Sequence, residues 1–96
     1  MARLTATQIK SALRSAPNWQ KKGSVISRTC KFKDFVAAIK FVNAVAVLAE
    51  KAQHHPDIDI RWNKVTLTLS THSEGGLTRK DFDLAKKIDG LAASAK

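Results

Sequence analysis

The stretch HHPDIDIRWNKVTLTLSTH, residues 54–72, decides the fold, because it contains the end of a helix and two successive strands. Pro56 breaks the helical pattern that precedes it. Residues 58–62 and 65–72 follow as two strands, which Asn63-Lys64 joins in a tight hairpin. In the second strand, alternate positions are apolar and face a core, and the positions between them carry Thr and Ser and end at a histidine. The stretch therefore predicts an antiparallel hairpin with histidines at both of its ends.

The flanking sequence adds three helices and a second hairpin. The helices are predicted at residues 5–15 with a Thr5–Gln8 capping box, at residues 35–53 with Asp34 as the N-cap, and from Thr78 onward with Asp81 at the third helical position. Residues 19–22 and 25–32 flank Gly23-Ser24 as the first hairpin. The order helix-strand-strand-helix-strand-strand-helix predicts an α+β fold, a four-stranded antiparallel sheet with three helices packed on one face, in a single domain of residues 1–96.

The charge is high for a chain of this length. The 96 residues carry a net charge of +9, with Lys and Arg scattered along the whole sequence. Such a balance is typical of proteins that bind nucleic acid or anionic surfaces. No recognition motif accompanies the charge, so we favour a solvated basic surface and do not expect a nucleic-acid partner. The alternative is a non-catalytic module that binds protein or nucleic acid through the same basic surface.

Cysteine content and hydropathy indicate the cellular setting. The single cysteine, Cys30, excludes an internal disulfide. The N-terminus has no hydrophobic segment of a signal peptide, and charged residues interrupt the longest apolar run, residues 35–52. We therefore expect a cytoplasmic protein without a membrane span. The helix formed by this run is apolar on more than one face, which favours contact with another subunit and hence a homodimer or homotetramer.

The three histidines, His54, His55 and His72, are candidate proton-handling groups. His54 and His55 follow the long helix and His72 ends the last strand, so the three imidazoles converge if those ends meet at one edge of the sheet. One imidazole would then protonate a leaving group while another removes a proton. The alternative is that His54 and His55 cap the helix C-terminus, where the helix dipole favours imidazolium.

Other chemistries fit the sequence less well. Three histidines can hold a catalytic zinc, but no ligand pair has the spacing of H-E-x-x-H, so no metal site is predicted. Ser70 and Ser73 lie near His72 without a nucleophile-elbow pattern. Gly75-Gly76 is too short to cradle a phosphate.

At the histidines the chain resembles the pterin-4a-carbinolamine dehydratase family. That family has an acidic residue ahead of a His-His-Pro, then an aromatic residue, a histidine and an aspartate. The matching segments are Glu50-Lys51-Ala52-Gln53-His54-His55-Pro56-Asp57, Trp62-Asn63-Lys64-Val65, Leu69-Ser70-Thr71-His72, Gly76-Leu77-Thr78 and Asp81. The resemblance extends from Trp19 to about Leu91.

The resemblance implies a cofactor-free dehydration of a 4a-hydroxytetrahydropterin to quinonoid dihydropterin and water, as in tetrahydrobiopterin recycling. It implies that His54 and His72 are candidate acids for the departing hydroxyl and that His55 orients the substrate or accepts a proton. It also places a set of substrate-binding residues around these histidines: Trp19, Glu50, Ser70, Thr71 and Asp81. Two of these have simpler alternatives, since Trp19 can fill the core and Asp81 can serve as a helix N-terminal carboxylate.

Overall fold

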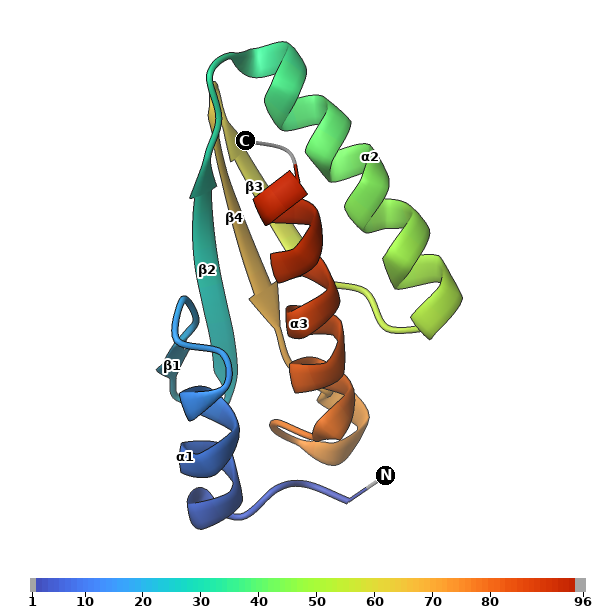
Figure 1. The fold of residues 1–96 in the computed structure, drawn as a ribbon. Helices are drawn as coiled ribbons and strands as arrows, with labels where there is room; N and C mark the ends of the chain where they lie inside the picture. Colours follow the sequence, from blue (N-terminus) through green and yellow to red (C-terminus); the bar gives the residue numbers. More distant parts are fainter. Residues whose placement is uncertain (1, 95–96) are drawn as a thin grey trace.

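The computed structural model describes residues 2–94, and its elements follow the predicted order (Figure 1). These elements are α1 (Ala6–Arg14), β1 (Gln20–Lys22), β2 (Val25–Lys31), α2 (Phe35–Ala52), β3 (Asp57–Arg61), β4 (Lys64–Leu69), the short 3-10 turn η1 (His72–Glu74) and α3 (Arg79–Ser94). The predicted fold class is thereby confirmed. No helix within residues 2–94 has the length and apolarity needed to cross a membrane.

The four strands form one antiparallel sheet in the order β1-β2-β4-β3, with the helices on one of its faces (Figure 1). β4 is a central strand, paired with β2 on one side and β3 on the other. Its residues Val65, Leu67 and Leu69 are fully buried, as the alternation of the sequence predicts. On β2, Ile26 and Cys30 point to the same core.

The helices are held at the positions that their caps predict. The Thr5 side chain accepts a hydrogen bond from the Gln8 backbone amide, and the Gln8 side-chain oxygen accepts one from the Thr5 backbone amide, which is the predicted capping box. Asp34 caps α2 through the Ala37 amide. Each of the two long helices buries one apolar stripe. The stripe of α2 consists of Ala38, Phe41, Val45 and Ala49, and that of α3 includes Phe82, Ala85, Ile88 and Ala92.

The second hairpin differs from the prediction in two respects. The turn consists of Trp62 and Asn63, because Arg61 pairs with Lys64, and Trp62 adopts the left-handed conformation at φ 52°. β4 ends at Leu69, so the prediction that this strand runs to His72 is wrong. The physical reason is that β4 has no pairing partners beyond this point. Its last pair with β2 is Leu69 with Ile26, and its last pair with β3 is Thr68 with Asp57.

Candidate active site

His54 reaches the base of α3 because α2 ends in a left-handed turn. Gln53 is the C-cap of α2, with φ 50° and ψ 43°, and its backbone N–H donates to the carbonyls of Ala49 and Glu50. The His54 amide also donates to Ala49 O. This turn closes the helix end with backbone bonds and redirects the chain. The His54 side chain, only 10% exposed, therefore lies against the first turn of α3 rather than continuing the helix.

His54 is paired with a completely buried carboxylate. His54 Nε2 lies 2.5 Å from Asp81 Oδ1, and Asp81 is 0% exposed. The second oxygen, Oδ2, accepts hydrogen bonds from the Thr71 hydroxyl and from the Thr78 amide, each at 2.9 Å. A buried carboxylate needs such donors to offset its loss of hydration. Asp81 thus ties the end of α2, the end of the β4 segment and the start of α3 into one network.

The directions of the hydrogen bonds in this network can be assigned. A carboxylate only accepts, so His54 donates from Nε2, and Nδ1 is the nitrogen left to exchange a proton. The single Thr71 hydroxyl proton goes to Asp81, so the Thr78 hydroxyl donates to Thr71 Oγ1 across 2.8 Å. The chain of donors from Thr78 through Thr71 to Asp81 therefore fixes the tautomer of His54.

His55 has its own carboxylate partner on the surface. His55 Nε2 lies 2.5 Å from Glu50 Oε2, and the two side chains are 59% and 71% exposed. Glu50 belongs to the last turn of α2, so the pair spans the same left-handed turn that redirects His54. Solvent weakens such a pair, and its contribution to folding is small. Its effect is to orient the His55 ring next to His54.

His72 is exposed and belongs to the η1 turn that follows β4. The preceding residue, Thr71, is buried and bonded to Asp81. The backbone of His72 is therefore one residue from the network that holds His54. Ser70, half-buried, precedes Thr71 at the same strand end. Of the predicted site residues, the structure brings His54, Thr71 and Asp81 together at the start of α3. It pairs His55 with Glu50 beside them in the sequence. His72 and Ser70 flank Thr71 along the chain, and their convergence with His54 stays a prediction.

Trp19 lies outside this cluster. It is 3% exposed, and its indole Nε1 donates to Asp89 Oδ1 at 2.8 Å. The Arg28 guanidinium pairs with the same oxygen. Asp89 lies eight residues beyond Asp81 on α3, which is about 12 Å along the helix axis. Trp19 therefore packs in the core, as one of its two interpretations predicts. A contact between Trp19 and the substrate stays a prediction.

Sequence reasoning placed Thr78 only as a helix cap and missed its part in the site. The Thr78 hydroxyl donates to Thr71, and its amide donates to Asp81. The spacing Thr78-x-x-Asp81 was the available signal, because a box-like cap brings these two residues together. Among residues 2–94, no three His, Cys, Asp or Glu side chains come together as metal ligands.

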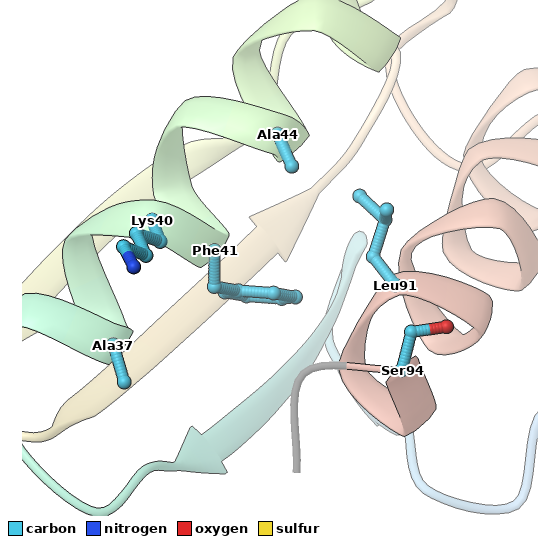
Figure 2. A pocket seen from close by; sticks show the side chains of 6 residues that line it. All are labelled: Ala37, Lys40, Phe41, Ala44, Leu91 and Ser94. Atoms are coloured by element: carbon cyan, nitrogen blue, oxygen red, sulfur yellow. The ribbon is translucent and has the colours of Figure 1, made fainter.

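An apolar hollow of about 270 Å³ lies between α2 and α3 (Figure 2). It is lined by Ala37, Lys40, Phe41, Ala44, Leu91 and Ser94. None of the predicted site residues belongs to it, and Leu91 and Ser94 come from the end of α3 opposite to Asp81. The hollow and the histidine cluster are therefore separate features.

The fold and the cluster together define a class of protein: a small α+β protein with histidines oriented by carboxylates, as acid–base catalysis requires. The family model for pterin 4 alpha carbinolamine dehydratase matches residues 2–91. The chain belongs to this family. Relatives named pterin-4-alpha-carbinolamine dehydratase confirm the assignment. A dehydratase of this kind is a hydro-lyase. One from Nocardia farcinica is 57% identical, covering 93% of this chain and 94% of the relative. One from Acidobacterium capsulatum is 55% identical, covering 95% and 99%.

Two solved structures have a fold similar to that of this chain. The transcriptional coactivator/pterin dehydratase from Brucella melitensis is 42% identical, with a TM-score of 0.90 over 94% of this chain and 98% of that one. A pterin dehydratase-like protein described as a RuBisCO assembly factor of the alpha-carboxysome is 25% identical, with a TM-score of 0.64 over 77% of this chain and 86% of that one. The same fold thus occurs in proteins with different named roles.

Proposed function

We propose that the single domain predicted for residues 1–96 is a 4a-hydroxytetrahydropterin dehydratase that works by histidine acid–base catalysis. The observation that carries the proposal is the pairing of His54 with the buried Asp81 in a chain that belongs to the dehydratase family. A histidine with a fixed tautomer, beside two further histidines, supplies the proton donor and acceptor that an elimination of water needs.

The reaction is balanced by two proton transfers. A protonated imidazole gives its proton to the hydroxyl on C4a, the C4a–O bond breaks, and water leaves. A neutral imidazole takes the proton from N5, and the electron pair of the N5–H bond forms the N5=C4a double bond of quinonoid dihydropterin. The substrate is neither oxidised nor reduced overall, so the chemistry requires no redox cofactor, and with imidazoles supplying both proton transfers it is proposed to proceed without a metal ion. His54 and His72 are the candidate acids, and His55 is the candidate acceptor or orienting group.

Asp81 and Glu50 are proposed to act through the histidines. Asp81 accepts from His54 Nε2, which leaves Nδ1 as the nitrogen through which His54 exchanges a proton, and as an acid His54 acts in its imidazolium form. Glu50 orients His55 in the same way on the exposed side of the site. Ser70, which follows the last residue of β4, is proposed to present backbone groups to the flat edge of the pterin. The Thr71 backbone is bonded to Gly76 and Glu74, so Thr71 is proposed to serve the site through its hydroxyl group, which holds Asp81.

Decay of the 4a-carbinolamine, followed by stopped flow with purified protein, tests the proposal. We expect decay well above the rate in buffer, unchanged by prior treatment of the protein with a metal chelator. A folded sample that gives no acceleration would remove the proposal. Loss of activity on chelation would remove the metal-free mechanism while keeping the reaction.

We also propose that the chain forms a homo-oligomer through α2 and works in the cytoplasm. Val36 and Val47 on α2 are 63% and 56% exposed. Eleven residues make about three helical turns, so the two valines lie on the same face. Exposed apolar residues on one face of a long helix favour burial against a second subunit.

A non-catalytic binding role is the second candidate. It is supported by the net charge of +9 and by the two solved relatives, one of which is named a coactivator and the other an assembly factor. Salt-sensitive binding to random DNA, in protein that lacks dehydratase activity, would favour this candidate. Absence of binding at low salt would remove its nucleic-acid form.

A further inference from the structure

The loop that carries His72 makes few stabilising contacts of its own. Residues 72–75 are all exposed. The two internal backbone bonds, from Glu74 N to Thr71 O and from Gly75 N to His72 O, close the turn on itself without tying it to the rest of the protein. The loop is anchored only where it begins and ends, at Thr71 and Gly76, which form a β-bridge. Thr71 is held by Asp81, so the question is what holds Gly76.

The N-terminal arm, residues 2–5, lies along this second anchor. The Leu4 amide donates to Leu77 O at 2.8 Å, and the Leu4 side chain packs against the core. The Arg3 side chain runs over the two glycines. A Cβ built on Gly76 would lie 2.9 Å from Arg3 Cδ and 3.4 Å from its Cγ, and one on Gly75 would lie 3.7 Å from its Nη1. Figure 1 shows the arm passing beside the loop at the base of α3.

The two glycines are required for different reasons. Gly75 adopts the left-handed conformation at φ 71°, which closes the turn. Gly76 is not among the residues with positive φ, so its backbone conformation would accept a side chain. A side chain there would have to displace the stem of the exposed Arg3 side chain. Gly76 is buried, so the methylenes of Arg3 cover it.

We propose that Arg3 is a positioning residue, which holds the His72 loop in place by packing its aliphatic stem across Gly76. The catalytic consequence rests on the proposed dehydratase function, because it matters only if His72 exchanges a proton with the substrate. Arg3 also lines a hollow of about 290 Å³ together with Lys21. The contact with Gly76 is made by Cγ and Cδ, which a lysine also possesses.

Four variants test the contact: Arg3→Ala, Arg3→Lys, Gly76→Ala and the double variant Arg3→Ala/Gly76→Ala. Lys10→Ala, an exposed cation on α1 that does not line the hollow, is the matched control. Two quantities are measured: hydrogen exchange of the Gly75 and Gly76 amides by NMR, and steady-state kinetics of carbinolamine dehydration.

For Arg3→Ala we expect these amides to exchange about tenfold faster while core amides are unchanged. We expect kcat to fall about tenfold with KM changed by less than about twofold, because a displaced acid lowers the rate more than the affinity. Arg3→Lys should restore both values. Gly76→Ala should reproduce the defect by displacing Arg3, and it should add little in the Arg3→Ala background.

Unchanged exchange in Arg3→Ala would overturn the proposal, and so would faster exchange with unchanged kcat in an active enzyme. A Gly76→Ala defect of equal size with and without Arg3 would show that Arg3 is not the reason for the glycine, which also overturns it. If the wild-type protein is inactive but Arg3→Ala accelerates exchange as expected, the dehydratase proposal fails while the contact between Arg3 and the loop stands.

Discussion

His54 and Asp81, which are 27 residues apart in the sequence, meet through His54 Nε2 and Asp81 Oδ1 at 2.5 Å. The carboxylate is fully buried and is held by donors from Thr71 and Thr78. A rigid acceptor that fixes one nitrogen of an imidazole leaves the other in a defined state, which is how carboxylates orient catalytic histidines in unrelated enzymes.

Replacing Asp81 with Asn should reverse the tautomer of His54. The amide oxygen would serve the Thr71 and Thr78 donors, so the NH2 group would face His54 Nε2 and require it to accept. Nδ1 would then carry the proton. Imidazole ¹⁵N chemical shifts measure the tautomer directly, and Asp83→Asn, exposed on the same helix, is the control. Retention of the Nε2–H form in Asp81→Asn would contradict the assigned directions of the hydrogen bonds.

His55→Ala should reduce the dehydration rate by about 100-fold or more, the loss expected for an acid–base group. Glu50→Gln should reduce it by less than about tenfold, because the His55–Glu50 pair is exposed and solvent weakens it. Stopped-flow rates of the two variants provide the comparison. Equal losses for both would indicate that the charge of Glu50, rather than the imidazole, is what the reaction uses.

Leu67→Ala should lower the free energy of unfolding by about 2–5 kcal/mol, because Leu67 is fully buried on the central strand β4 and leaves a cavity when truncated. Thr68→Ala, on the half-buried opposite face of that strand, should lower it by less than about 1 kcal/mol. Urea denaturation followed by circular dichroism gives both values. Similar losses would mean that the open face of the sheet contributes as much as the core.

Val47→Glu should dissociate the proposed oligomer, since it places a charge on the exposed apolar face of α2. Sedimentation velocity at several protein concentrations should show the wild-type chain as a dimer or tetramer and the variant as a monomer. Lys86→Glu, exposed on α3, is the control and should leave the assembly intact. A monomeric wild-type chain at all concentrations would contradict the proposal.

The sequence predicted the fold well because each element carries a local signal. The Thr5–Gln8 box, the Asp34 cap and the alternation from Val65 to Leu69 each act over a few residues, and the structure contains all of them. The end of β4 was misplaced because the segment was extended past Leu69, where the apolar alternation stops and the pairing with β2 and β3 ends.

The histidines and Asp81 stand out in the sequence by type and spacing, but the contacts between them do not. The bond from His54 to Asp81 joins the end of α2 to the start of α3, two segments that are far apart in the sequence. The spacing of Thr78 and Asp81 signals the amide contact between them, but the hydroxyl contact from Thr78 to Thr71 joins segments that no local pattern connects. Trp19 could equally have lined a pocket or filled the core, and its bond to Asp89 depends on a helix that comes 70 residues later.

We propose that His54 and Asp81 act as one unit in the dehydration of a 4a-hydroxytetrahydropterin. Stopped-flow dehydration rates of the wild-type chain, His54→Ala, Asp81→Asn and the double variant test it most directly. We predict that each single variant loses about 100-fold or more and that the double variant is no slower than His54→Ala, because residues that act as a unit are not additive. Multiplicative losses in the double variant, or full activity in His54→Ala, would contradict the account.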